Sequence, residues 1–321
     1  NSNMYDMSVD ELRKYMGSTP KANDFEEYWE RGLQEMRRVE ANIEWKKADF
    51  TVPYADCFDL YYTGVKNARI HAKVIIPKKK ARLFPALLTF HGYSSRCGSW
   101  TSKMQYAAAG FVVAAMDCRG QGGASEDSGG VKGTTFQGHF IRGLDGEADH
   151  MLMRNIFLDT AQLAGIIMEL PEVDETRIGV YGGSQGGALS IACAGLERRI
   201  SRISVQYPFL SDYKRALEMD SPDSAYQELR NYFRLFDPQH LKEREIFERL
   251  SYIDVQNFAG KIKGTVQMGA SLMDITCPPS TQFAVFNKLN CEKRIYMFYE
   301  YGHENLPDYD DMEMRFFLKD W

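Results

Sequence analysis

The sequence predicts an α/β protein with a mostly parallel sheet and helices on both of its faces. Short apolar runs that suit strands buried on both faces alternate with longer segments of helical spacing. Repeated strand and helix units in this order are typical of a parallel sheet between two helical layers. The strands are expected at 50–60, 70–76, 86–90, 111–116, 178–181, 203–207, 265–268 and 294–298, and the main helices at 99–109, 149–169, 186–196, 279–289 and 309–318.

Composition excludes several classes of protein. With 321 residues, 44% of them hydrophobic and 26% charged, the chain can bury a large core and is neither disordered nor fibrous. The net charge of -5 and the scattered basic residues disfavour nucleic acid as a partner. The longest nearly apolar stretch, 106–116, is far shorter than the ~20 residues that span a membrane. Six widely spaced cysteines and the lack of a secretory leader favour a cytoplasmic location.

Two helices are expected before the first strand. Ser8 with Glu11, and Asn23 with Glu26, each pair a capping residue with a glutamate three positions later. The second helix carries an apolar stripe at helical spacing, which predicts that it docks onto the body of the protein. That stripe consists of Phe25, Tyr28, Trp29, Leu33 and Met36. Residues 1–45 are therefore interpreted as a helical extension of one domain that spans 1–321.

One segment interrupts the alternation of strands and helices. From about 212 to 257 the chain is charged and helical, which predicts a helical cap inserted over the edge of the sheet. Its apolar stripe also gives weak support to burial between subunits. That stripe consists of Tyr226, Leu229, Tyr232, Phe233 and Phe236.

The segment 182–186 reads Gly-Gly-Ser-Gln-Gly and matches G-x-S-x-G. It falls where the strand 178–181 meets the helix 186–196, which is the context of the nucleophile elbow in α/β-hydrolases. The sharp turn exposes the serine, and glycines flank it because a Cβ would collide with the neighbouring chain. Ser184 is therefore the candidate nucleophile.

The remaining members of a catalytic triad are sought in the order serine, acid, histidine. Of the six histidines, only His303 follows a late strand. Asp274 follows the strand 265–268 and lies between Ser184 and His303, so it is the preferred acid. Asp254, at the end of the predicted cap, is the alternative, whereas Asp308 comes after the histidine.

Two backbone N–H groups should stabilise the oxyanion. Gln185 N–H directly follows the nucleophile, and Tyr93 N–H lies in the His-Gly-Tyr loop after the strand 86–90. The acyl group is expected to fit between the elbow and the side chains of Tyr93, Pro208 and Ile275. Because His139 and His150 have no partner at ligand spacing, neither a metal nor a cofactor is expected.

At these residues the chain resembles the acetyl xylan esterase and cephalosporin C deacetylase family, carbohydrate esterase family seven. Three signatures stand in order: Arg-Gly-Gln-Gly at 119–122, Gly-Gly-Ser-Gln-Gly-Gly at 182–187 and His-Glu at 303–304. Segments 10–15 and 272–279 are also similar, so the resemblance covers essentially the whole chain.

The resemblance implies an α/β-hydrolase with Ser184, Asp274 and His303 as the triad and with Tyr93 and Gln185 at the oxyanion hole. It also implies an intracellular, metal-free deacetylase that acts on acetylated xylo-oligosaccharides and other small acetate esters. Such enzymes are often homohexamers. Under the resemblance, Arg119 is a buried residue that braces the nucleophile or histidine loop, whereas the motif alone favours a surface turn with a solvated arginine.

Other functions are compatible with the same residues. A triad of this kind also serves broad carboxylesterases, thioesterases and acyl peptidases. A catalytically inactive hydrolase fold used for protein association would be favoured if a triad member were missing, but all three are present.

Overall fold

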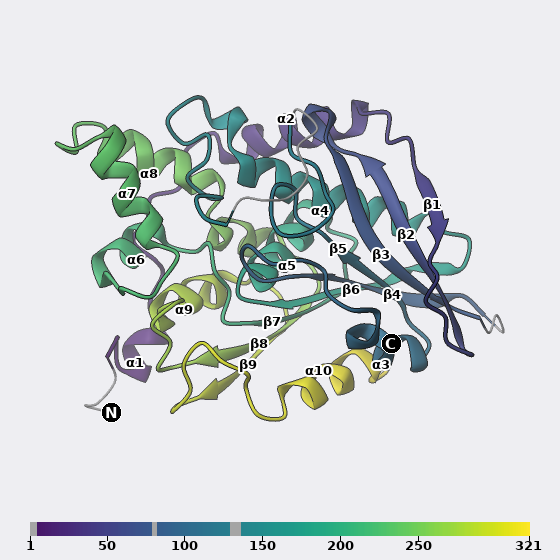
Figure 1. Cartoon of the computed structure of the whole chain (residues 1–321). Helices are drawn as coiled ribbons and strands as arrows, with labels where there is room; N and C mark the ends of the chain where they lie inside the picture. Colours follow the sequence, from purple (N-terminus) through teal and green to yellow (C-terminus); the bar gives the residue numbers. More distant parts are fainter. Residues whose placement is uncertain (1–4, 79–81, 129–135) are drawn as a thin grey trace.

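A nine-stranded sheet runs through the computed structural model, which describes residues 5–78, 82–128 and 136–321 (Figure 1). In spatial order the strands are β1 (Glu44–Lys47), β2 (Ala55–Thr63), β3 (Arg69–Pro77), β5 (Val112–Met116), β4 (Phe84–Phe90), β6 (Val173–Gly183), β7 (Arg202–Gln206), β8 (Thr265–Ser271) and β9 (Lys293–Phe298). In this spatial order, β1, β2, β3 and β5 pair with one another in antiparallel fashion. All the pairs from β5 through β4 to β9 are parallel. The mostly parallel sheet and the α/β-hydrolase fold predicted from the sequence are confirmed.

The antiparallel edge of the sheet differs from the prediction. β1 was not predicted, because it is a short edge strand whose residues are largely exposed and three of which are charged. It begins at Glu44, so the last two residues assigned to the helical extension 1–45 belong to the sheet. β2 begins at Ala55 rather than at residue 50, because a turn at Pro53 and Tyr54, closed by a bridge between Val52 and Ala55, precedes it.

Helices cover both faces of the sheet. One face carries α2 (Phe25–Arg38), α4 (Leu152–Met168), α5 (Gln185–Leu196) and α9 (Pro279–Lys288), and the other carries α3 (Met104–Ala108) and α10 (Tyr309–Leu318) (Figure 1). Within β4, Leu88 belongs to the large core that contains α4 and α5, whereas Leu87 meets Tyr106 of α3 and Phe317 of α10. Both faces of this strand are therefore buried, as its continuous apolar run predicted.

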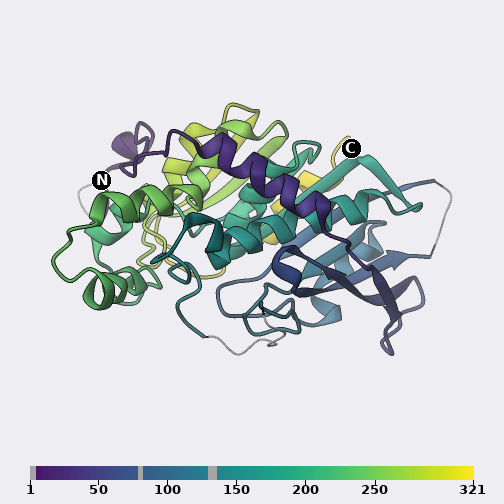
Figure 2. The ribbon, with the colours of Figure 1, turned by 90° about the horizontal axis from the view of Figure 1, so that it is seen from above.

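The two N-terminal helices are present. Ser8 caps α1 (Val9–Leu12) in a capping box with Glu11, as predicted. The second helix begins at Phe25 after Asp24, without a side-chain cap, so Asn23 does not cap it. Trp29 stacks on Phe157 of α4 with ring centroids 5.7 Å apart, and Figure 2 shows α2 lying across α4. The predicted docking of α2 onto the body is confirmed.

Between β7 and β8 lie the helices α6 (Tyr213–Met219), α7 (Gln227–Phe236) and α8 (Glu243–Tyr252), followed by the 3-10 helix η4 (Val255–Lys261). The helices α6, α7 and α8 gather at the end of the molecule opposite β1 (Figure 1). Of the predicted apolar stripe, every residue except Phe236 is buried within the chain, and Phe236 is 52% exposed. The stripe therefore serves mainly the chain's own core and leaves only Phe236 available to another subunit, so it adds little support to the predicted oligomer, which stays a prediction.

Glu313 of α10 is buried against the sheet, and none of the described side chains places a positive charge beside it. Its carboxylate accepts hydrogen bonds from Tyr106 Oη and Ser204 Oγ, each 2.9 Å away. Burial raises its pKa from 4.5 to about 8. The folded state therefore holds a proton that the unfolded chain releases, between about pH 5 and about pH 8.

This raised pKa predicts that the free energy of unfolding falls as the pH rises through that window. Glutamine cannot titrate and keeps a neutral hydrogen-bonding group. Over the same pH range, the free energy of unfolding of Glu313→Gln should therefore fall less than that of the parent, by on the order of a few kcal/mol. Denaturant unfolding at several pH values measures the difference between the variant and the parent. Asp311→Asn, on the exposed face of α10, is the matched control. A pH-independent difference for Glu313→Gln would contradict the prediction.

Candidate active site

The three residues proposed as a triad follow the carboxyl ends of three strands of the parallel sheet. Ser184 follows β6, Asp274 lies three residues after β8, and His303 lies five residues after β9. Because the carboxyl ends of parallel strands meet at one edge of a sheet, the chain order found in the sequence brings these residues to the same edge.

Ser184 lies in a sharp turn between β6 and α5. Its backbone has φ 56° and ψ −120°, which is strained for a residue other than glycine. A Cβ on Gly182 would lie 2.6 Å from the carbonyl carbon of Gly186, and a Cβ on Gly186 would lie 2.0 Å from the Phe90 carbonyl oxygen. The glycines thus allow α5 to start directly against the ends of β4 and β6, as a nucleophile elbow requires.

Asp274 holds His303 by a hydrogen bond of 2.9 Å between Oδ2 and Nδ1. The carboxylate is fully buried and also accepts hydrogen bonds from Ser271 Oγ and from the N–H groups of Thr276 and Cys277, each at 2.8 Å. The imidazole is about one quarter exposed. This arrangement orients the ring, and Nε2, which no described residue hydrogen-bonds, can exchange a proton with a substrate or nucleophile.

Two residues, Cys277 and Tyr207, connect Asp274 and His303 to the elbow at Ser184. Cys277 donates its backbone N–H to Asp274, and its buried thiol is close enough to form a hydrogen bond with the Ser184 hydroxyl. Burial raises the pKa of the thiol, and the contact with Ser184 lowers it in part. Tyr207 packs its ring 4.5 Å from that of His303 and lies against the backbone of Gly183. All three candidate residues therefore border one site.

Within the described chain, Ser184 Oγ makes no hydrogen bond to the His303 ring. Hydrogen bonds between catalytic groups are often long or misaligned before substrate binds and tighten afterwards.

The alternative acid, Asp254, is not placed beside His303. Its hydrogen-bond partners among the described residues are the Asp212 N–H, at 3.0 Å, and Gln256. Burial, with the nearby charge of Asp212, raises the pKa of Asp254 to about 7. Asp254 therefore joins the cap to η4 and is not part of the site.

The N–H groups of Tyr93 and Gln185 face no hydrogen-bond acceptor among the residues that the structure describes. Both residues are positioned by Gln121. Its Oε1 accepts the Ser94 N–H at 2.8 Å, and its Nε2 donates to Gln185 Oε1 at 2.9 Å. Gln121 was not identified from the sequence, although it lies in the motif at 119–122. The bracing of the nucleophile or histidine loop was assigned to Arg119 of the same motif.

Arg119 is fully buried and pairs with Asp159 of α4, with two nitrogen–oxygen distances of 2.7 Å. It also donates to the Val65 carbonyl in the 3-10 helix η1 (Val65–Asn67). The expected burial is confirmed, but Arg119 braces α4 and η1 rather than the nucleophile or histidine loop.

The three residues predicted to line an acyl pocket lie around this edge. Pro208 is buried after β7 and close to the start of α5, Ile275 follows Asp274 and is 43% exposed, and Tyr93 is half-buried. Their contact with an acyl group stays a prediction.

One cluster has side chains of the kinds that bind metals. Ligand atoms of His71, Cys97 and Asp117 lie within 4.8 Å of one another. Both His71 nitrogens are already hydrogen-bonded, to Asp117 and Asp59 at 2.7 Å, and Asp117 accepts backbone N–H groups as well. The cluster satisfies its own polar groups, and an ion would have to displace these bonds.

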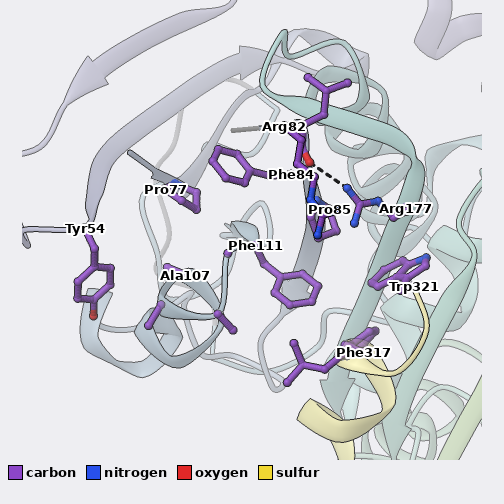
Figure 3. Close-up of a pocket in the computed structure, with 15 residues that line it drawn as sticks. Tyr54, Pro77, Arg82, Phe84, Pro85, Ala107, Phe111, Arg177, Phe317 and Trp321 are labelled. Carbon is purple, nitrogen blue, oxygen red and sulfur yellow. Dashed lines mark hydrogen bonds between the residues drawn. The ribbon is translucent and has the colours of Figure 1, made fainter. Parts of the chain in front are cut away.

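A pocket of about 480 Å³ lies at the opposite end of β4 from the His91–Tyr93 loop (Figure 3). The side chains of Phe84, Phe111, Phe317 and Trp321 border it, and Arg177 donates to the Leu83 carbonyl at its rim. It begins where β4 begins, so it is separate from the edge that holds Ser184. No described helix is both long and apolar enough to cross a membrane.

A family model and two solved structures identify acetyl xylan esterases as relatives of this chain. A family model described as acetyl xylan esterase (AXE1) matches residues 2–321. The crystal structure of acetyl xylan esterase 1 from Thermoanaerobacterium sp. superposes with a TM-score of 0.94 at 56% identity and covers 98% of this chain and 99% of its own. The acetyl xylan esterase from Paenibacillus sp. R4 gives 0.91 at 32% identity, with 97% and 99% covered.

A curated relative is longer than this chain. Acetyl esterase Axe7A of Xylanibacter ruminicola is 28% identical over 283 residues, which are 86% of this chain and 62% of the relative. The match thus spans less than two thirds of that protein.

Proposed function

Because the chain belongs to the acetyl xylan esterase family, we propose that it is a serine esterase that removes acetyl groups from acetylated xylo-oligosaccharides. Related small acetate esters, including those of the cephalosporin C type, are proposed as further substrates. The observation that carries the proposal is the His303–Asp274 hydrogen bond at the sheet edge that also bears Ser184.

In the proposed reaction, Ser184 Oγ attacks the acetyl carbonyl carbon while His303 Nε2 takes the hydroxyl proton. Negative charge develops on the carbonyl oxygen and is stabilised by the N–H groups of Tyr93 and Gln185. The C–O bond to the sugar then breaks, and the sugar oxygen receives the proton from His303. Water attacks the acetyl-serine in the same manner, which releases acetate and restores the hydroxyl.

Acetate release from acetylated xylo-oligosaccharides tests the proposal directly. Monosaccharide acetates, a cephalosporin C type acetate, an acetyl thioester and an acetylated peptide should be compared at matched concentrations. The proposal expects oxygen esters of sugars to be cleaved with the highest kcat/KM. A preference for the thioester or the peptide would favour the other hydrolase activities that the same triad supports.

Acyl chain length offers a second prediction. The acyl group is proposed to fit between the elbow and the side chains of Tyr93, Pro208 and Ile275, so we expect little room for a longer acyl chain. Each methylene that does not fit costs roughly 1 to 3 kcal/mol of overpacking, so kcat/KM should fall by about ten-fold or more per step. A series of nitrophenyl esters should show acetate preferred, propionate tolerated and octanoate nearly inert. A maximum at hexanoate or octanoate would contradict a deacetylase.

We also propose a homo-oligomer larger than a dimer, a hexamer by resemblance to the family. On the cap, Leu235, Phe236 and Leu241 are exposed apolar side chains that another subunit could cover. A mass near the single-chain value of 36.8 kDa in light scattering would contradict this assembly.

A further inference from the structure

Glu228 of the cap helix α7 reaches the loop that carries the Tyr93 N–H. One carboxylate oxygen accepts a hydrogen bond of 2.7 Å from Tyr93 Oη, and the other accepts one of 2.7 Å from the Gly138 N–H. Tyr93 Oη in turn accepts the Phe140 N–H at 3.1 Å. The cap, the loop after β4 and the segment 138–140 are thus joined at a single carboxylate.

The Glu228 carboxylate is buried. Glu228 is only 7% exposed, and no positively charged side chain of the described chain acts on it. Burial raises its pKa, and the hydrogen bonds from Gly138 and Tyr93 oppose that rise. A buried carboxylate without a cation is costly for stability. The two hydrogen bonds that the carboxylate accepts offset part of this cost, and they fix the Tyr93 hydroxyl and the Gly138 N–H to the cap.

Two hydrogen bonds, one on either side, fix the position of Tyr93. From the side of the sheet, Gln121 accepts the N–H of the next residue, Ser94. From the side of the cap, Glu228 holds the hydroxyl of Tyr93, and the rings of His139 and Phe209 flank the Tyr93 ring with centroids 4.6 Å and 5.2 Å away. With its ring and the following N–H both fixed, Tyr93 has little freedom to turn its own N–H away.

We propose that Glu228 is a positioning residue, which holds the Tyr93 N–H at the place of the oxyanion through the Tyr93 hydroxyl. The inference rests on the proposed function, because it assumes that an oxyanion forms beside Ser184. It gives the cap a part in transition-state stabilisation in addition to covering the sheet edge. Loss of one oxyanion donor costs about 10²- to 10³-fold in kcat. A displaced donor should cost less than a lost one, on the order of 10-fold or more.

A double-mutant cycle between Tyr93→Phe and Glu228→Gln tests this coupling. Tyr93→Phe keeps the backbone N–H and the ring but removes the hydroxyl. Glu228→Gln keeps the size of the side chain but offers one acceptor to two donors. Each variant should lower kcat on nitrophenyl acetate by about ten-fold or more, with KM changed by less than about three-fold. The double variant should be no slower than the slower single one, because both changes break the same contact.

Tyr232→Phe is the matched control on the same helix. Tyr232 lies one turn after Glu228 and also joins α7 to the body through its hydroxyl, but that hydroxyl donates to Asp145 Oδ1 at 3.0 Å and, among the described residues, not to Tyr93 or Glu228. Its kcat should equal that of the parent. An equal loss in Tyr232→Phe would show a general effect of cap docking and would overturn the inference, as would additive losses in the cycle. If Glu228→Gln does not fold, Tyr93→Phe with the parental kcat would overturn it alone.

Failure of the proposed function would look different. In that case the parent protein would not hydrolyse acetate esters, or Ser184→Ala would hydrolyse them equally well. An active parent that needs Ser184 but shows no coupling between Tyr93 and Glu228 would remove only the positioning role.

Discussion

Ser184→Ala should fold normally and hydrolyse acetate esters with a kcat reduced by a factor of about 10⁴ or more. The covalent step needs the hydroxyl oxygen, and no other described hydroxyl lies in the elbow between β6 and α5. Alanine at φ 56° carries the same backbone strain as the serine it replaces, so stability should change little. Initial rates on nitrophenyl acetate, with thermal unfolding as the check on folding, give the comparison. An unchanged kcat would remove Ser184 from the mechanism.

Asp274→Asn should lower kcat by a factor on the order of 10⁴. The buried carboxylate accepts hydrogen bonds from His303, Ser271 and two backbone N–H groups. An asparagine amide would present an N–H to one of these donors and would remove the charge that stabilises the imidazolium. The loss of that charge falls on the transition state, so kcat should change more than KM.

Asp254→Asn is the matched control for this substitution. Asp254 is also a fully buried acid that accepts backbone N–H groups, but its partners are Asp212 and Gln256. The activity of the folded variant should equal that of the parent. If Asp254→Asn abolished hydrolysis and Asp274→Asn did not, the acid would have been assigned wrongly.

The core of the fold could be predicted because its strands are apolar on both faces. The central strands β4, β5, β7 and β8 lie within three residues of their predicted bounds, since only burial under two helical layers explains such runs. β6 begins five residues before its predicted start, because residues 174–177 are polar and not buried. The edge strand β1 could not be predicted, because a mostly exposed strand of Glu, Trp and two Lys has no periodic signal. The apolar stripe of the cap predicted a buried face correctly but could not say that the chain itself covers most of it.

The candidate triad follows from chain order and strand ends, which are local signals. Gln121 and Glu228 could not be assigned in the same way, because their roles depend on contacts across the sequence. Glu228 is 135 residues from Tyr93, and Gln121 is 64 residues from Gln185. A buried glutamate in a charged helical segment has the same sequence pattern as a solvated one, so only the packed cap distinguishes them.

Covalent labelling with a fluorophosphonate, followed by peptide mass spectrometry, tests most directly whether Ser184 is an activated nucleophile that acts on acetylated xylo-oligosaccharides. Reaction at the proposed site should attach one label per chain at Ser184 and abolish acetate release in proportion to labelling. Acetylated xylo-oligosaccharide should slow the labelling, because it occupies the same site. Label on a different residue, or a fully labelled Ser184 with acetate release intact, would contradict the proposed mechanism.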